Sequence, residues 1–480
     1  MSKRSDKKGD LVRWMDHAAP ERDRWIRLNR SYYKDLVQLL SHSIPPDSSV
    51  LEIGCGTGFL LNALNPKRGV GIDISSGMLE VARREYPHLE FCQMDAERLT
   101  LGEKFDVVIL SDVLGYFEDI QQAFRELKKV CTPATRIILT YHSFLWNPLL
   151  TVAEKLHLKM AQNRLNWLNR NDIENLLYVE GFDVIKTGRR FVFPFRIPLL
   201  QTLCNTYLSQ LPLFNGLGIT GYTVARLLPE AARETAEAPP GRTVSVIVPA
   251  RNEKGNIENI IKRIPRMGTH TEVIFVEGNS TDGTLEEIQR VCRAYASEWD
   301  VKWLVQDGKG KGDAVRKGFA AAQGDILMIL DADISVAPED LTKFYDAIAR
   351  GRGEFINGSR LVYPLEDEAM RTLNMIGNKF FSVMFSWLLG QRLKDTLCGT
   401  KVIDRSNYQR LLRNRAYFGD FDPFGDFDLI FGSAKLNLKI VEIPIRYYAR
   451  EYGQTNISRF SHGWLLLKMV LFAMNRIKFV

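Results

Sequence analysis

The sequence has 480 residues, 45% hydrophobic and 25% charged, which is an ordinary globular composition that predicts two to four domains. The net charge of +7 is small for this length, and no basic aromatic-rich repeat or zinc spacing indicates a nucleic-acid-binding module. Six isolated cysteines indicate reduced thiols rather than a disulfide framework. Without an apolar signal core or an apolar run of about 18 residues, the sequence predicts a cytoplasmic protein.

One break in composition divides the chain. Residues 229–241 contain alanine, glutamate and proline and no large apolar residue, as in a solvated linker. On each side of it, a short apolar run leads into a polar turn, and strand-like and helix-like segments then alternate. We therefore predict two α/β domains, residues 1–228 and 242–480, each a doubly wound open sheet.

The first apolar run leads into a glycine-rich turn. It starts at Val50 and reaches Gly54, Gly56 and Gly58, three alternate glycines that let the backbone approach a ligand closely. Glu52 stands directly before them, where a carboxylate can attract a cationic ligand. By itself such a glycine turn is equally compatible with a dinucleotide site.

Carboxylates end the next two predicted strands. Asp73 ends strand 69–73, where it can accept hydrogen bonds from both hydroxyls of a ribose. Asp95, followed by Ala96, ends strand 89–94, where a carboxylate can accept a hydrogen bond from an adenine amine. The order of these features favours an adenosine-containing ligand.

Over about residues 48–190, this half resembles the class I methyltransferases. The resemblance implies a Rossmann-like fold and S-adenosylmethionine as cofactor, with its methionine part held by the loop 54–58. It also implies that Asp73 takes the ribose, that Met78 packs against adenine, and that Asp95 with the alanine after it recognises the adenine amine. Because the sulfonium is already a good leaving group, positioning can supply much of the rate.

The sequence does not identify the methyl acceptor. Asp112, Tyr116 and His142 lie near predicted strand ends and are candidates for a base, but no motif selects one of them. The absence of an identifiable base leaves open an alternative, in which this half is a non-catalytic regulatory module that binds the cofactor. Residues 191–228, apolar and broken by prolines, fit either a cap on this domain or a docking surface for a partner.

In the second half, polar clusters again follow predicted strands. Strand 244–248 runs into Pro249, Arg251 and Glu253, and the next strand runs into Glu277. Because ligands of open α/β sheets bind at the carboxyl ends of the strands, we expect these clusters to form one site.

Asp331 and Asp333 carry the strongest chemical signal, because they directly follow the buried strand 326–330. Residues two apart in an extended segment point the same way, so both can approach one Mg²⁺ or Mn²⁺, which prefer oxygen ligands. Such an ion would neutralise a diphosphate leaving group. Lys309 and Lys311, flanked by glycines, can reach a nucleotide or phosphate; the alternative is an exposed basic loop.

Over about residues 242–460, this half resembles the family 2 glycosyltransferases of the GT-A fold, and much of it resembles the polyprenyl-phosphate sugar synthases. The resemblance implies a UDP- or GDP-linked sugar donor, a metal on the acidic pair, and a glycan or lipid-phosphate acceptor. Two positions depart from the pattern. Glu277 begins a Glu-Gly-Asn-Ser stretch where Asp-Asp-Gly-Ser is usual, which leaves open whether the donor carries uridine or guanosine. Ser335 stands where glutamine is frequent.

The same resemblance covers residues further downstream. Arg360 offers a cation for a phosphate, and Arg450 belongs to a loop that closes over the diphosphate in this family. Asp395, Asp426 and Asp428 are candidates for a general base; the alternative for all three is loop capping or ion pairing. A base is needed only for a hydroxyl acceptor, because a phosphate is already an anionic nucleophile.

The C-terminal apolar segment 464–472, followed by Arg476 and Lys478, is too short to span a bilayer. It fits either a peripheral helix at the inner face of the membrane or a helix packed on the sheet. The whole sequence thus predicts a bifunctional transferase for methyl and sugar groups. A nucleotidyltransferase would want a glycine-rich basic loop after its first strand, which residues 249–253 do not provide.

Overall fold

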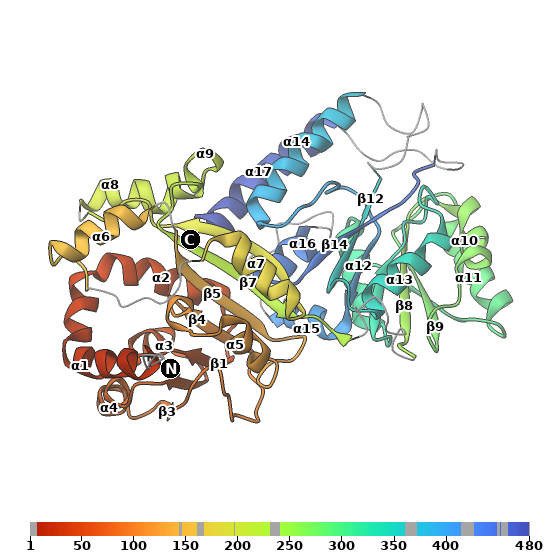
Figure 1. The fold of residues 1–480 in the computed structure, drawn as a ribbon. Helices are drawn as coiled ribbons and strands as arrows, with labels where there is room; N and C mark the ends of the chain where they lie inside the picture. Colours follow the sequence, from red (N-terminus) through yellow and green to blue (C-terminus); the bar gives the residue numbers. More distant parts are fainter. Residues whose placement is uncertain are drawn as a thin grey trace. The chain divides into compact units, whose positions relative to one another are not determined.

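The computed structural model describes nine stretches of the chain, which are residues 7–143, 146–160, 168–195, 197–230, 241–360, 372–413, 427–448, 452 and 459–479 (Figure 1). The chain divides into two compact units, one of Met1–Leu228 with Phe479–Val480 and one of Pro229–Lys478. Most of the predicted linker 229–241 lies outside the described residues.

In the described part of the first unit, seven strands form one mixed sheet in the order β3-β2-β1-β4-β5-β7-β6. The strands are β1 (Ser49–Ile53), β2 (Arg68–Asp73), β3 (Glu90–Gln93), β4 (Val107–Ser111), β5 (Arg136–His142), β6 (Phe182–Arg190) and β7 (Thr220–Leu227). Strands β1 to β5 are parallel, whereas β7 is antiparallel to both β5 and β6. The strand order reverses beside β1, and this is where open sheets form a ligand-binding crevice.

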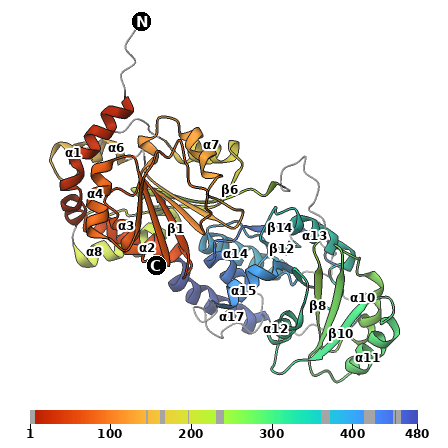
Figure 2. The same ribbon diagram turned by 90° about the horizontal axis from the view of Figure 1, so that it is seen from below.

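Helices cover both faces of this sheet. They are α1 (Lys7–Leu28), α2 (Arg30–Ser43), α3 (Phe59–Leu64), α4 (Ser76–Glu85), α5 (Ile120–Leu127), α6 (Asn147–Lys155), α7 (Arg170–Val179), α8 (Pro198–Thr202) and α9 (Pro212–Asn215). Figure 2 shows α3 and α4 on one side of the strands and α7 on the other. Because strand side chains alternate, Val108 and Leu110 join the core cluster under α5 and α7, whereas Val107 and Ile109 join the cluster under α2 to α4.

Residues 191–228 take two different roles. Their last part is β7, which completes the sheet between β5 and β6. Their first part keeps large apolar side chains in solvent, and Leu199 and Leu213 are 89% and 88% exposed. This segment therefore caps the domain only in part.

The described residues of the second unit also form a mixed seven-stranded sheet, with the order β10-β9-β8-β11-β13-β12-β14. The strands are β8 (Val244–Ala250), β9 (Thr271–Glu277), β10 (Asp300–Val305), β11 (Ile326–Ile329), β12 (Phe355–Ser359), β13 (Lys401–Asp404) and β14 (Ile440–Pro444). Here β13 is the strand that runs antiparallel to its neighbours β11 and β12. The predicted pair of α/β open sheets is confirmed, with an antiparallel strand inserted into each.

Helices again cover both faces. They are α10 (Ile257–Arg263), α11 (Thr284–Tyr295), α12 (Lys311–Ala321), α13 (Leu341–Ala349), α14 (Thr372–Leu389), α15 (Arg405–Arg413), α16 (Phe427–Lys435) and α17 (Arg459–Ala473). Figure 1 shows α14 and α17 side by side, and Met469, Val470 and Ala473 of α17 are buried in the same core cluster as Phe385 of α14. One face of α17 is thus a core face, while Trp464 is 59% exposed. None of the helices in the described ranges is long and apolar enough to cross a membrane.

Candidate functional site

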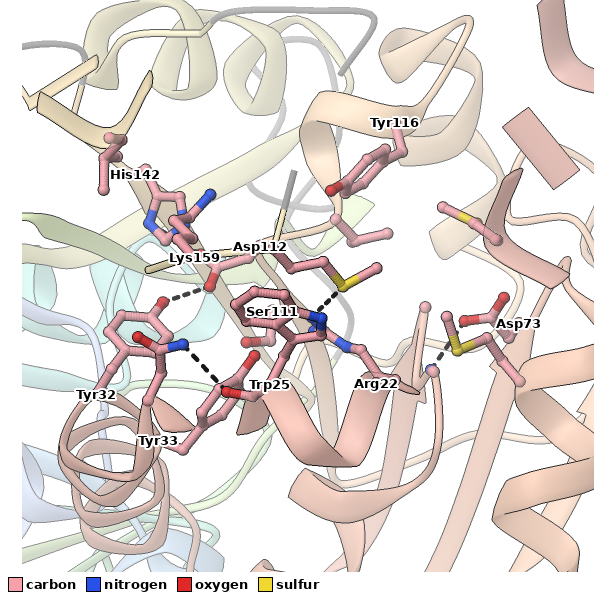
Figure 3. A pocket seen from close by; sticks show the side chains of 18 of the residues that line it. Arg22, Trp25, Tyr32, Tyr33, Asp73, Ser111, Asp112, Tyr116, His142 and Lys159 are labelled. Atoms are coloured by element: carbon pink, nitrogen blue, oxygen red, sulfur yellow. Dashed lines mark hydrogen bonds and ion pairs between the residues drawn. The ribbon is translucent and has the colours of Figure 1, made fainter. Parts of the chain in front are cut away.

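A pocket of about 720 Å³ opens in the first unit where the strand order reverses (Figure 3). The last residues of β1, β2, β4 and β5 line it, so it lies at the carboxyl ends of the parallel strands. Six residues predicted to bind the cofactor line it together: Gly54, Gly56, Asp73, Met78, Asp95 and Ala96. Glu52 and Gly58, predicted with them, are not among the lining residues.

The glycine turn and Asp73 are fixed to one another. Gly56 has φ of 54°, a left-handed conformation that favours glycine, and a Cβ there would meet no atom within 4 Å. Its N–H donates to Oδ2 of Asp73 over 2.8 Å, and the N–H of Ser75 donates to Oδ1 over 2.9 Å. Burial raises the pKa of Asp73, although these amides act in the opposite direction. A carboxylate oxygen has further acceptor capacity, so Asp73 can still receive ligand hydroxyls.

Glu52 lies beneath the turn rather than in the pocket. Its side chain is buried, and its Oε2 has no hydrogen-bond partner among the described residues. Burial, together with the charge of Asp73, raises the pKa of Glu52 to about 8. Since a protonated carboxyl carries no charge, the structure gives no support to the expectation that Glu52 attracts a cation in the unliganded protein.

Helix α1 contacts each of the loops that carry the predicted cofactor residues. The Nζ of Lys8 lies 2.6 Å from Oδ2 of Asp95. Oδ1 of Asp16 accepts an N–H from the first turn of α4 over 2.9 Å, and Oδ1 of Asp23 accepts the hydroxyl of Thr57 over 2.6 Å. These residues belong to no motif, so the sequence alone does not identify them. The one sequence pattern that connects two of them is that Asp16 and Asp23, seven residues apart, lie on the same face of a helix.

The opposite side of the pocket holds the candidate bases (Figure 3). Asp112 directly follows β4 with φ of 53°, and its Oδ2 accepts a hydrogen bond from the hydroxyl of Tyr32 on α2. The hydroxyl of Thr140 lies 3.3 Å from its Oδ1, and Nδ1 of His142 lies 3.9 Å from the same oxygen. Burial and the charge of Asp112 hold the pKa of Tyr32 well above its usual value, so Tyr32 remains a donor. Tyr116 lines the pocket as well.

In the second unit, the loops after β8 and β9 are joined by hydrogen bonds. The N–H of Asn252 donates to the hydroxyl of Ser280 over 3.0 Å, and Oδ1 of Asn252 accepts the N–H of Thr281 over 2.9 Å. The predicted nucleotide residues Pro249, Arg251, Glu253 and Glu277 therefore lie on adjoining strand ends. Arg251 is exposed.

The two glutamates of this group are buried and bonded within their own loops. Oε2 of Glu253 accepts from the amide of Asn256 over 2.8 Å, and Oε1 of Glu277 accepts the N–H of Ser280 over 2.5 Å. Each carboxylate thus stabilises the loop that would hold the nucleotide. Contact with the base or ribose stays a prediction.

Asp331 and Lys311 form an ion pair at the end of β11. The Nζ of Lys311, the first residue of α12, lies 2.6 Å from Oδ1 of Asp331. Burial acts to raise the pKa of Asp331, but the charge and hydrogen bond of Lys311, together with the charges of Lys401 and Arg360, outweigh it, and the pKa is lowered. Asp331 is therefore an anion beside a cation. Lys309 lies on the exposed loop before α12.

The turn 395–401 approaches Asp331 so closely that a side chain at Gly399 would displace the turn or the carboxylate. A Cβ on Gly399 would lie 1.8 Å from Oδ2 of Asp331 and 2.6 Å from Nζ of Lys311. Lys401, from the same turn, is buried and adds positive charge near Asp331. The structure thus brings together the acidic pair, the basic loop and this turn, which the sequence placed in three separate segments.

Asp333 is held by a strained turn. Ile334 has φ of 52°, a conformation that is costly for a β-branched residue. The bend directs Oδ1 of Asp333 to the N–H and hydroxyl of Ser335, which lie 3.0 and 2.7 Å away. Across the described residues, no group of three or more His, Cys, Asp or Glu side chains is arranged to hold a metal ion. The predicted metal therefore depends on the acidic pair together with ligands from the substrate.

Asp395 forms a two-pronged ion pair with Arg360. Its oxygens lie 2.7 Å from Nε and 2.8 Å from Nη2 of Arg360, and its side chain is wholly buried. The guanidinium carbon lies 5.0 Å from the ring centre of Tyr447. This geometry suits Asp395 to orienting Arg360 rather than to accepting a proton. Asp428, at the start of α16, lies 3.8 Å from Nη1 of Arg316. The predicted residues Asp426 and Arg450 lie outside the described residues.

Two family profiles match the chain. Residues 51–139 match the methyltransferase domain, and residues 245–418 match glycosyl transferase family 2. The first match contains the pocket's glycine turn and Asp73, and the second contains the acidic pair. The chain therefore combines a methyltransferase domain with a family 2 glycosyltransferase domain.

Relatives of the second half include one archaeal and one fungal enzyme. Glycosyltransferase AglJ of Haloferax volcanii is 28% identical over 225 residues, which are 46% of this chain and 69% of that protein. Dolichol-phosphate mannosyltransferase of Saccharomyces cerevisiae is 37% identical over 110 residues, which are 22% of this chain and 40% of the yeast enzyme. The chain thus covers only part of either protein.

The solved structures similar to either half have low TM-scores. A methyltransferase of Thermotoga maritima, described as dependent on S-adenosylmethionine, has 19% identity and a TM-score of 0.36, covering 45% of this chain and 99% of its own. Glucosyl-3-phosphoglycerate synthase of Mycobacterium tuberculosis, in complex with Mn²⁺ and UDP, has 20% identity and a TM-score of 0.37, covering 52% and 82%. The domain assignment accordingly rests on the family profiles and the strand order.

The close approach of Gly399 to Asp331 gives a prediction that concerns stability alone. We expect Gly399→Ala to lower the free energy of unfolding by about 1–3 kcal/mol, because the added methyl group displaces either the turn or the acidic side chain. Gly377→Ala is the matched control, since a Cβ there meets nothing within 4 Å and lies in helix α14. It should be neutral or stabilising by up to about 1 kcal/mol. Urea unfolding measures the free energy of unfolding of both variants and of wild type. If Gly399→Ala is as stable as wild type, the site around Gly399 is not crowded.

Proposed function

We propose that residues 1–228 bind S-adenosylmethionine and transfer its methyl group, and that residues 242–480 transfer a sugar from a nucleotide donor to a lipid-phosphate acceptor. Residues 229–241 join the two domains. Each proposal deepens the domain assignment by naming substrates. For each, one feature of the described structure carries the argument.

For methyl transfer, that feature is a single pocket with the predicted cofactor residues on one side and an acid–hydroxyl cluster on the other. Figure 3 shows Asp73 on one side, Asp112 with Tyr32 on the other, and Arg22 between them. A transferase needs cofactor and acceptor in one enclosure, whereas a regulatory module needs room only for the cofactor. The extension of the pocket to Asp112 and His142 therefore favours catalysis over the regulatory alternative.

The lining residues have different roles. Asp73 holds the ribose, Met78 packs on adenine, and the charge of Arg22 suits the carboxylate of the methionine part. Asp112 is the base for an acceptor that must lose a proton, and Tyr32 fixes the orientation of its carboxylate.

For sugar transfer, the feature is the ion pair of Asp331 with Lys311 beside Asp333. A divalent cation suits this position, because both donors are carboxylates and the neighbouring ammonium of Lys311 keeps Asp331 in its anionic form. Asp331 and Asp333 would hold the ion, and when bound it would neutralise charge on the donor diphosphate. Lys311 binds the same diphosphate, and the loops after β8 and β9 hold the nucleoside.

The acceptor proposal draws on chemistry and on the relatives. The match to dolichol-phosphate mannosyltransferase favours a polyprenyl phosphate. A phosphate acceptor needs no base, which agrees with Asp395 being engaged by Arg360. Arg360 is then a cation for a phosphate, held in place by Asp395 and stacked on Tyr447.

The cofactor site is tested by Asp73→Ala. The substitution leaves two ribose hydroxyls without an acceptor, and each lost pairing should cost roughly 1–3 kcal/mol of binding free energy. Titration calorimetry with S-adenosylmethionine measures the change. Glu80→Ala, which removes an exposed acid from α4, is the control and should bind like wild type. Equal affinity of wild type and Asp73→Ala would refute the assignment.

The metal site is tested by Asp333→Asn, which keeps the shape and removes one charge. We expect sugar transfer to fall by roughly two orders of magnitude or more, a loss of ~3 kcal/mol in transition-state stabilisation. The rate of methyl transfer should not change in Asp333→Asn. The control variant Asp346→Asn, on the exposed side of α13, should transfer sugar at the wild-type rate. The assay is run with Mg²⁺ or Mn²⁺ and again with excess chelator. Full activity in chelator would show that the acidic pair only shapes a turn.

A further inference from the structure

The part of the pocket beyond the predicted cofactor residues is mainly apolar. Its lining includes aromatic and aliphatic side chains from several elements: Trp25, Trp146, Leu150, Phe191 and Ile219. The rings of Tyr32 and Phe191 meet edge to face with centres 5.4 Å apart. Asp112, Tyr32 and His142 form a polar cluster within this lining. Such a lining selects an acceptor with a large apolar body and one reacting polar group.

The mouth of this region is also apolar. Five side chains both line the pocket and are more than half exposed; we call these the apolar rim, and they are Leu149, Val152, Leu156, Leu158 and Phe195. Four of them come from α6 and the turn after it. A soluble substrate entering from water gains nothing from such a rim, and large exposed apolar surfaces mark interaction sites.

The apolar rim continues onto the segment 197–213. Ile197 and Leu203 are 52% and 50% exposed, and Leu199 and Leu213 are more exposed still. The hydrogen bond of Trp146 Nε1 to the carbonyl oxygen of Leu217, 2.7 Å, ties the start of α6 to the chain that directly follows this segment. Rim and segment therefore belong to one part of the first unit.

A basic side chain lies beside the rim. Lys155 is exposed directly before the rim residue Leu156, and the exposed His157 lies between Leu156 and Leu158. The one acid on this stretch, Glu154, is paired with Lys159 over 2.7 Å. Exposed apolar side chains beside a lysine are a pattern that inserts into the interface of an anionic bilayer, where the ammonium meets lipid phosphates.

We propose that the methyl acceptor is a membrane lipid, whose hydrocarbon chain passes over the apolar rim and whose headgroup hydroxyl reaches Asp112. This inference rests on the proposed binding of S-adenosylmethionine in the same pocket. The occupant of the rim and of segment 197–213 is the bilayer itself. A second protein or another segment of this chain would need no open path from this surface to Asp112.

The transfer step balances with the groups in the pocket. The lipid hydroxyl oxygen forms a bond to the methyl carbon as the carbon–sulfur bond breaks, and that electron pair stays on sulfur. The hydroxyl proton passes to the carboxylate of Asp112. A sulfonium and a carboxylate thus become a neutral thioether and a neutral acid, and the apolar surroundings favour this loss of charge.

Membrane docking is tested with the full-length chain and vesicles of phosphatidylcholine and phosphatidylglycerol. Wild type should sediment with the vesicles. The double variant Leu199→Glu with Leu213→Glu should partition roughly tenfold less or weaker still, because two carboxylates replace inserted apolar groups. The matched control is Tyr178→Glu with Val179→Glu, since these residues are 79% and 56% exposed at the end of α7. It should sediment like wild type.

The acceptor is tested on the same proteins with methyl-labelled S-adenosylmethionine and vesicles made from a total lipid extract. We expect label in the organic phase with wild type and the control, and a loss of roughly tenfold or more with the Leu199 and Leu213 variant. Calorimetric affinity for S-adenosylmethionine should be equal in all three, which also shows that each is folded.

The outcomes separate the two proposals. Wild type that binds the cofactor but stays in the supernatant, or labels only water-soluble material, overturns the lipid acceptor and leaves the cofactor site standing. Wild-type sedimentation that is unchanged in the Leu199 and Leu213 variant overturns the assigned docking surface. Wild type that does not bind S-adenosylmethionine overturns the proposed function, and the lipid acceptor with it.

Discussion

The crevice beside the central strand of each sheet is the constraint on which both sites depend. Strand order reverses between β1 and β4 in one unit and between β8 and β11 in the other, so the loops after these strands diverge and leave backbone and side chains facing open space. In the first unit, the hydrogen bond from Gly56 to Asp73 fixes the loop after β1 to the end of β2. In the second, the turn around Gly399 closes against Asp331 and Lys311. Each arrangement fixes an anion at a strand end.

Much of this arrangement could be predicted, because strand ends carry a local signal. A buried apolar run followed by glycines or carboxylates identifies the end of a parallel strand, and parallel strands end at one edge of the sheet. Gly54, Asp73 and Asp95, which the sequence assigns to one ligand, do line one pocket, and Asp331 and Lys311, which it assigns separately to the donor phosphates, form an ion pair. The antiparallel strands β7 and β13 escaped prediction, since an apolar run does not reveal the direction of its pairing.

The parts that sequence did not predict depend on contacts between distant segments. The role of α1 arises from Lys8, Asp16 and Asp23, which are ordinary surface-type residues until the helix lies on the cofactor loops. Glu52 was expected to face a ligand, but burial makes its charged form unfavourable. Likewise Asp395 is committed to Arg360, 35 residues earlier in the chain. No spacing rule predicts such a pairing.

The central claim is that one chain carries two separate ligand sites, one for S-adenosylmethionine and one for a nucleoside diphosphate. Titration calorimetry of the full-length protein tests it directly, first with S-adenosylhomocysteine and then, in the same cell, with UDP or GDP in the presence of Mn²⁺. The account predicts two saturable events, each with one ligand per chain, and retention of the second event in an Asp73→Ala protein. A single event, or competition between the two ligands for one site, would contradict it.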